Sequence, residues 1–189
     1  TNMLAAAAIA GDLQIRADAE SHRGEYRRII EGFNSTMDAV VEPLHDASDF
    51  IRKLAAGEGD KQLDNTYRGD YAKLIDDVNS VLASLNIMQE EMNSLAQHAV
   101  LGNLSYRADS TRLKGGFADI VVGVNVSLDA VIKPIEEASD VLSRMAEGDL
   151  SARVTGEYEG DHAKIKKALN HTLEAMQSYI DDISRILSA

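Results

Sequence analysis

The stretch Gly148–Arg153 reads GDLSAR, and two variants occur earlier in the chain, GDLQIR at Gly11–Arg16 and GNLSYR at Gly102–Arg107. A fourth, degenerate copy begins at Gly57 with GEGDKQLD. The spacings between the four opening glycines, taken along the chain, are 46, 45 and 46 residues. A constant period of this size indicates a tandem array of one supersecondary unit. We therefore expect the 189 residues to hold four copies of one structural repeat.

Two further landmarks keep the same period. A second glycine follows at Gly24, Gly69, Gly115 and Gly160, and an asparagine follows at Asn34, Asn79, Asn125 and Asn170. We number the copies 1 to 4 and call the segment between the two glycines of a copy its connector, which gives residues 11–24, 57–69, 102–115 and 148–160. The second glycine lies 13 residues after the first in copies 1 and 3 but 12 residues after it in copies 2 and 4, so the copies alternate in type.

The sequence between connectors has the period of long α-helices. After connector 1, apolar residues recur at steps of four and three, at Tyr26, Ile30, Phe33, Met37, Val40, Leu44, Ala47, Ile51 and Leu54. The stretch after connector 3 repeats this stripe. Two apolar positions in seven are typical of a helix that packs along other helices in a coiled coil or bundle. Another helix is expected from about Asp70 to Val100, and its stripe changes phase between Leu82 and Met88, which alters coiled-coil winding locally.

The connectors are expected to join helices that run parallel. The opening glycine of each connector can end a helix in a left-handed conformation. Apolar residues such as Leu13, Leu104 and Leu150 then follow, which would reach into the groove between two helices. Thirteen extended residues cover about 40 Å, enough to return along a helix of about 14 residues and about 21 Å. Pro43 and Pro134 are interpreted as junctions inside continuous helices, because the stripe of apolar residues passes through them unbroken.

Composition excludes several classes of function. The net charge of −12 repels phosphate backbones and anionic lipid, so we expect neither nucleic-acid nor membrane-surface binding. The absence of cysteine removes thiolate nucleophiles and disulfides. No apolar run approaches the roughly 20 residues that span a bilayer.

No sequence pattern points to catalysis. The five histidines lack paired metal-ligand spacing, and the glycine phrase lacks the lysine of a phosphate loop. Glu25, Asp70 and Asp161 stand at expected helix starts, where a carboxylate caps backbone N–H groups and meets the positive end of the helix dipole. The recurrent asparagines are interpreted as polar groups beside the apolar stripe that fix its register. We therefore expect no catalytic, cofactor, metal or small-molecule site.

These features together resemble a tandem array of HAMP domains, the relay modules of bacterial chemoreceptors and sensor kinases. The matching pieces include Pro134, EGDL at Glu147–Leu150, the helix-opening Asp161 and FNSTM at Phe33–Met37, with LNHTL at Leu169–Leu173 as a variant. The resemblance covers nearly the whole chain. Copy 2 departs from it by lacking the leucine after Gly57, and copy 3 has Gly116 in place of the helix-opening acid.

The resemblance implies an all-α fold of consecutive parallel four-helix coiled-coil bundles, each formed by a homodimer and joined to the next by continuous helices. It implies modules at residues 1–42, 43–87, 88–133 and 134–178, followed by an exit helix at residues 179–189. It also implies a non-enzymatic, cytoplasmic segment of a receptor, with or without a membrane anchor. Displacement or rotation of a helix would alter bundle packing and so reach a downstream receptor signalling or kinase domain of the same chain.

Two other interpretations stay open. A passive dimeric coiled-coil spacer would set the distance between input and output domains and would tolerate changes at Leu104 or Leu150. An enzyme or metal protein built on a four-helix bundle would need carboxylate and histidine ligands that face inward, and the stripe positions offer almost none.

Overall fold

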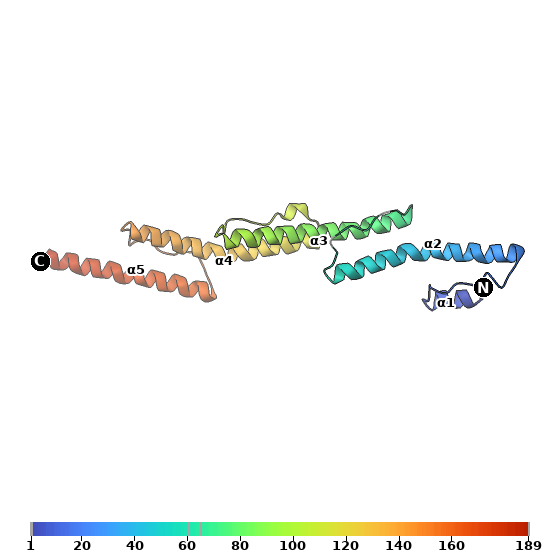
Figure 1. Cartoon of the computed structure of the whole chain (residues 1–189). Helices are drawn as coiled ribbons and strands as arrows, with labels where there is room; N and C mark the ends of the chain where they lie inside the picture. Colours follow the sequence, from blue (N-terminus) through green and yellow to red (C-terminus); the bar gives the residue numbers. More distant parts are fainter. Residues whose placement is uncertain (1, 60, 65, 189) are drawn as a thin grey trace. The chain divides into compact units, whose positions relative to one another are not determined.

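The computed structural model describes residues 2–59, 61–64 and 66–188, and within them the chain is helical and contains no strand. The elements are α1 (Asn2–Ile9), α2 (Gly24–Ala55), α3 (Asp70–Val100), the short 3-10 helix η1 (Ser110–Arg112), α4 (Gly116–Ala146) and α5 (Gly160–Leu187), as Figure 1 shows. The all-α class is confirmed, and the helix predicted from Asp70 to Val100 has the expected limits.

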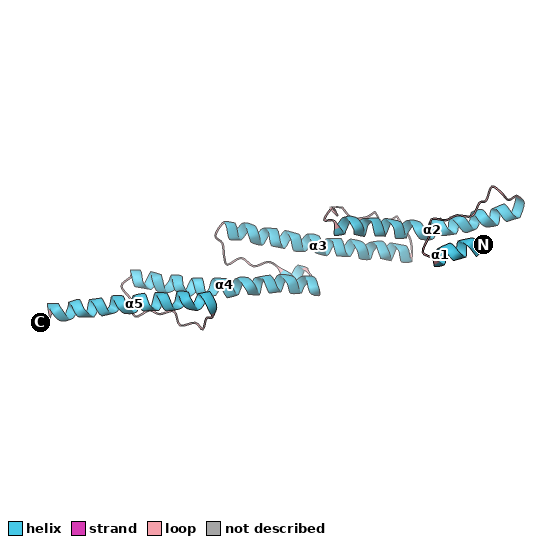
Figure 2. Ribbon diagram, turned by 90° about the horizontal axis from the view of Figure 1, so that it is seen from below, coloured by secondary structure: helices cyan, strands magenta, loops and turns pink. Residues whose placement is uncertain are grey.

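The chain forms two compact units whose boundary lies between Asn86 and Ile87, inside α3. The N-terminal unit contains α1, α2 and the first part of α3, and the C-terminal unit contains the rest of α3, η1, α4 and α5. Within each unit, every connector runs back along the helix that precedes it. The two helices that a connector joins therefore point the same way (Figures 1 and 2). We call these the first and the second helix of a copy.

Proline does not end the long helices. Pro43 lies inside α2 and Pro134 inside α4, and both are buried. A proline within a helix removes one backbone hydrogen bond, and its ring clashes with the carbonyl of the residue four positions earlier. The helices nevertheless continue through these positions, as the unbroken apolar stripe predicts.

Every helix that leads into a connector ends on the same turn. In copy 4 the N–H of Asp149 donates to the carbonyl of Arg144 at 2.9 Å, and the N–H of Gly148 donates to the carbonyl of Met145 at 3.0 Å. These are the two hydrogen bonds of a Schellman motif. Gly148 has a φ of 92°, a left-handed conformation that side chains disfavour. Equivalent turns and positive φ values occur at Gly11, Gly57 and Gly102, so the predicted helix-ending role of the opening glycines is present in all four copies.

The hydrophobic cores are small and lie within single copies. In copy 4 the core joins Val141 of α4, Leu150, Ala152 and Val154 of the connector, and Leu173 of α5. The described part of copy 2 is centred on Phe50, Val78 and Leu82, and that of copy 3 on Ala108, Leu113 and Val121. Each core therefore depends on a first helix, a connector and a second helix together.

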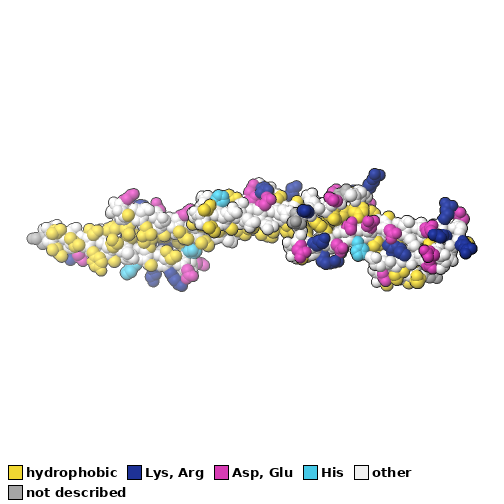
Figure 3. Space-filling model, in the orientation of Figure 1, with side chains coloured by type: hydrophobic (Ala, Val, Ile, Leu, Met, Phe, Trp, Pro, Cys, Tyr) yellow, Lys and Arg dark blue, Asp and Glu magenta, His cyan; other side chains and the backbone are white. Residues whose placement is uncertain are grey.

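Much of the predicted apolar stripe remains uncovered within one chain. Tyr26 is 74% exposed and Ile51 is 51% exposed, and along α4 Val131 and Leu142 are 50% and 45% exposed. Figure 3 shows hydrophobic side chains gathered over α4 and α5. An extended apolar surface of this kind marks an interaction face. None of the described helices has the combination of length and apolar character that a membrane crossing requires.

Candidate functional site: the connectors

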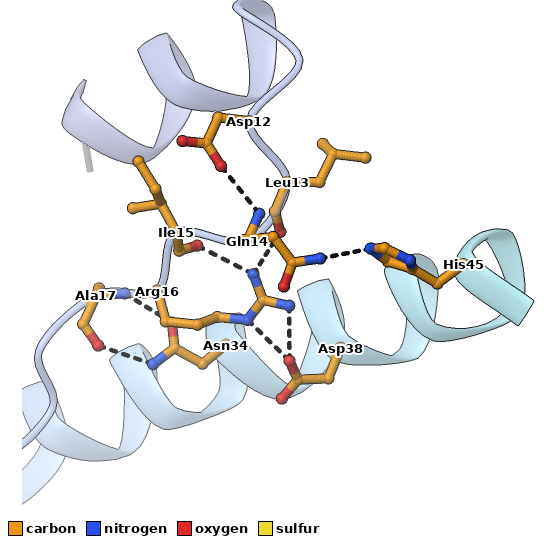
Figure 4. Close-up of polar contacts among 9 residues, drawn as sticks. All are labelled: Asp12, Leu13, Gln14, Ile15, Arg16, Ala17, Asn34, Asp38 and His45. Carbon is orange, nitrogen blue, oxygen red and sulfur yellow. Dashed lines mark hydrogen bonds and ion pairs between the residues drawn. The ribbon is translucent and has the colours of Figure 1, made fainter. Parts of the chain in front are cut away.

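One asparagine of each second helix binds the connector backbone through both atoms of its amide. Asn34 accepts a hydrogen bond from the N–H of Ala17 at 3.0 Å and donates to the carbonyl of Ala17 at 2.8 Å (Figure 4). The same two bonds, 2.8–3.0 Å long, join Asn79 to Leu63, Asn125 to Ala108 and Asn170 to Val154. We call this arrangement the asparagine clamp.

The clamp corrects one interpretation drawn from the sequence. The asparagines were expected to fix the register of the apolar stripe, but their amides face the connector instead. Backbone N–H and carbonyl groups that are buried away from water need hydrogen-bond partners. The clamp supplies both partners to one connector residue per copy.

In copies 1 and 3 an arginine adds a second attachment to the second helix. Arg16 contacts Asp38 Oδ1 through Nε at 2.8 Å and Nη2 at 2.7 Å (Figure 4). Arg107 contacts Asp129 Oδ1 in the same way, at 2.9 and 2.6 Å. The remaining Nη1 of each arginine donates to two connector carbonyls, so the guanidinium also holds the shape of the connector. Arg153 of copy 4 makes only the carbonyl contacts, to Leu150 and Ala152.

In copies 2, 3 and 4 a carboxylate of the first helix holds the connector from the other side. The three acids, Asp46, Glu91 and Glu137, each lie 11 residues before the opening glycine. Each contacts the residue ten positions after that glycine. Tyr67 donates to Asp46 at 2.6 Å, Arg112 pairs with Glu91 at 2.5 Å, and Tyr158 donates to Glu137 at 2.6 Å. We call these residues the first-helix acids.

The first-helix acids were missed in the sequence. The signal that would reveal them is the constant separation of 21 residues between the acid and its partner in the connector. Because the partner is tyrosine in two copies and arginine in the third, no single motif marks the pair.

Among the residues that the structure describes, Glu137 accepts more hydrogen bonds than Asp46 or Glu91. Besides Tyr158, it accepts hydrogen bonds from the N–H of Thr155 at 2.6 Å, the hydroxyl of Thr155 at 3.0 Å and the N–H of Gly156 at 3.1 Å. The bonds from Tyr158 and from the backbone lower the pKa of Glu137 to about 2. In copy 2 the hydrogen bond to Asp46 raises the pKa of Tyr67 to about 12.

The stability of the C-terminal unit is expected to fall as the pH drops from about 5 toward 2. Because the folded state lowers the pKa of Glu137 from 4.5 to about 2, its stabilisation is complete above the ordinary pKa and is lost as the pH approaches the folded value. Glu137→Gln removes this titration. Urea midpoints measured by circular dichroism at several pH values should therefore depend less steeply on pH in Glu137→Gln.

Glu136→Gln is the matched control, since Glu136 is exposed and adjacent. Its pH dependence should equal that of the unmodified chain. Asp149, whose pKa is also about 2 because of Ser151 and Arg144, titrates equally in all three proteins. An identical acid slope in Glu137→Gln and the unmodified chain would show that this carboxylate does not stabilise the folded unit.

The acids at the helix starts were expected to cap backbone N–H groups, but the N-cap residues of α2 and α5 are Arg23 and Glu159. Glu25 pairs with Arg28 at 3.1 Å, Asp70 with Lys73 at 2.8 Å and Asp161 with Lys164 at 2.7 Å, each on the helix surface. The carboxylates still lie in first turns, where the helix dipole favours negative charge. At the start of α4 the N-cap is Gly115, with φ 54° and ψ −140°, a region open essentially to glycine.

The three connector leucines differ in their surroundings. Leu150 is buried in the core of copy 4, Leu13 is half-buried, and Leu104 is 42% exposed. In connector 3 the buried positions are Ala108 and Leu113. The tethering role expected of Leu104 therefore passes to residues further along the connector.

Comparison with known proteins agrees with this architecture. The HAMP domain matches residues 21–95 and 112–178, which together exceed half of the chain. A stretch of 95 residues is 25% identical to the methyl-accepting chemotaxis protein McpB of Pseudomonas aeruginosa, and the alignment covers 50% of this chain but only 14% of that protein. The chain thus corresponds to a small part of the relative's length. Its helical pairs, its recurring connectors and these matches show that the chain belongs to the HAMP domain family, as a tandem array.

Proposed function

We propose that this chain relays a mechanical signal along its helices to an output domain on its C-terminal side. HAMP domains are signal-relay modules of chemoreceptors and sensor kinases. In the proposal the chain pairs with itself in parallel, with modules at residues 43–87, 88–133 and 134–178, a first module at residues 1–42, and an exit helix at residues 179–189.

The observation that carries the proposal is the alternation in how connectors are fastened. In copies 1 and 3 an ion pair binds the connector to the second helix, through Arg16 and Arg107. In copies 2 and 4 a tyrosine hydroxyl binds it to the first helix, through Tyr67 and Tyr158. Copy 3 also has a first-helix attachment, through Arg112 and Glu91, so the feature that alternates is the ion pair to the second helix. Its presence in copies 1 and 3, beside the tyrosine contacts of copies 2 and 4, favours modules that respond differently to the same helix displacement and so pass on an altered bias.

The uncovered stripe supports pairing between two copies of the chain. Along α4 the stripe residues Val131, Ile135 and Leu142 are 45–50% exposed. Helices with a heptad stripe bury it against equivalent helices. A parallel dimer would complete a four-helix bundle around each connector-joined pair.

Disulfide locking in a chimeric receptor tests both parts of the proposal. The chain would replace the HAMP segment of a chemoreceptor with a known attractant, and the output would be kinase activity. Because the chain has no cysteine, Val124→Cys introduces one thiol per protomer on the stripe. We expect a disulfide between protomers and loss of the attractant response, restored by reduction.

Ser127→Cys serves as the control, since Ser127 is exposed, lies one turn from Val124 and is off the stripe. It should form little disulfide and leave the response intact. A normal response from the fully cross-linked Val124→Cys receptor would favour a passive spacer. A chain that stays at 20.5 kDa by light scattering at all concentrations would contradict the paired bundle.

A further inference from the structure

In copies 3 and 4 a single peptide group of the connector is held by both helices. The carbonyl of Val154 accepts a hydrogen bond from Asn170 of α5 at 2.9 Å. The N–H of the same peptide group, which belongs to Thr155, donates to Glu137 of α4 at 2.6 Å. In copy 3 the carbonyl of Ala108 accepts from Asn125 of α4 at 2.8 Å, and the N–H of Asp109 donates to Glu91 of α3 at 2.9 Å.

We propose that this peptide group is the element that couples the position of the first helix to that of the second helix within one chain. We call it the peptide bridge. The inference rests on the proposed relay function and specifies where displacement passes inside a module. Glu91 and Glu137 act as positioning residues on the input side of the bridge, and Asn125 and Asn170 act on its output side.

The peptide bridge suits this role because it is rigid and polarised. Partial double-bond character keeps the carbonyl and N–H of one peptide unit in a plane, so a pull on one end moves the other. A hydrogen bond to the carbonyl also strengthens the donor at the N–H, because chains of hydrogen bonds polarise one another. Displacement of Glu137 along α4 therefore changes the bond that Asn170 makes, although these two side chains reach the bridge from different helices.

Copy 4 repeats the arrangement at the next peptide group. Lys166 of α5 donates to the carbonyl of Thr155 at 3.2 Å, and Glu137 accepts from the N–H of Gly156 at 3.1 Å. Two successive peptide groups thus lie between an anionic acceptor on α4 and donors on α5. Buried charge supports the same geometry in copy 3, where Glu91 is only 5% exposed and pairs with Arg112 of the connector.

Hydrogen exchange of the full 189-residue chain, followed by NMR, tests the bridge. The decisive amide is that of Val154, whose N–H is held by Asn170 and makes no bond to Glu137. In Glu137→Ala we expect its exchange to accelerate about tenfold, because losing the bond on Thr155 weakens the clamp on the neighbouring residue. In Asn170→Ala the amides of Thr155 and Gly156, which Glu137 holds, should accelerate by a similar factor.

Three comparisons separate coupling from general destabilisation. Glu136→Ala should leave the amide of Val154 within about twofold of the unmodified rate, and in all variants the Ala108 amide of copy 3 should do the same. If Glu137→Ala unfolds copy 4, the exchange rate of the Leu173 amide will rise as much as that of the Val154 amide. The experiment then uses Glu137→Gln in place of Glu137→Ala. Because glutamine keeps an acceptor oxygen, Val154 should exchange at a rate between those of the unmodified chain and the unfolded copy.

The bridge would be overturned if, in whichever Glu137 variant stays folded, only the amides of Thr155 and Gly156 exchanged faster and the exchange rate of the Val154 amide were unchanged. The measurement needs neither a dimer nor an output domain. The exchange experiment can therefore contradict the bridge while the receptor chimera still relays a signal. Conversely, a chimera that relays no signal does not alter the exchange result.

Discussion

Replacing Leu173 by alanine is expected to lower the free energy of unfolding of the C-terminal unit by about 3 kcal/mol. Leu173 is fully buried, and it meets Val141 of the first helix and Leu150 and Val154 of the connector. The substitution removes apolar contacts with both segments and leaves a cavity. The connector cannot move inward to fill the cavity without stretching the clamp that Asn170 makes on Val154.

Urea unfolding followed by circular dichroism measures this loss at fixed protein concentration. Leu101→Ala is the matched control, because Leu101 is 81% exposed beside Gly102 and the corresponding position of copies 1 and 2 is already alanine. Its effect should stay within about 0.5 kcal/mol. If the Leu173 variant lost less than about 1 kcal/mol, the core of copy 4 would not be packed as described.

Replacing Asn125 by alanine is expected to cost about 2–3 kcal/mol, although it removes no apolar contact from the core. Ala108 is 4% exposed, and Asn125 is the partner of both its N–H and its carbonyl. The variant leaves a buried donor and a buried acceptor unpaired, each at the desolvation cost of that group. The same urea experiment reports the change.

Two further variants at this helix face make the result specific. Asn125→Asp keeps an acceptor for the Ala108 N–H but turns a second oxygen toward the Ala108 carbonyl, so it should be at least as harmful as alanine. Ser127→Ala removes only a bond from an exposed hydroxyl to the carbonyl of Gly123 and should change stability by less than about 0.5 kcal/mol. A loss for Asn125→Ala no larger than that for Ser127→Ala would rule out a structural role for the clamp.

The parts of the fold that depend on local sequence were predictable. The apolar period of α3 needs only residues three and four apart, and its predicted limits match the structure. The opening glycines were predictable for the same reason, because a left-handed helix end has few compatible residues. Neither feature depends on which distant segment lies nearby.

The contacts across the connectors were not predictable from the same signals. The position of Asn125 beside the stripe was visible, but its partner is a backbone group of Ala108, which leaves no trace in residue identity. The pairing of Glu137 with Tyr158 requires the connector to return along α4, so it depends on the path of the chain in space. Asp161 was expected to cap its helix, but the N-cap position belongs to Glu159, and Asp161 lies in the first turn, where it pairs with Lys164.

The asparagine clamp also bears on how such arrays diverge. Because the amide reads only main-chain atoms, the clamped residue is free to vary, and it is Ala17, Leu63, Ala108 and Val154 in the four copies. The clamp itself therefore sets no requirement on the side chain at this position, and where that residue is buried, as at Ala108 and Val154, core packing sets the limit. Low sequence identity between the duplicated copies is therefore compatible with the same clamp geometry in all four of them.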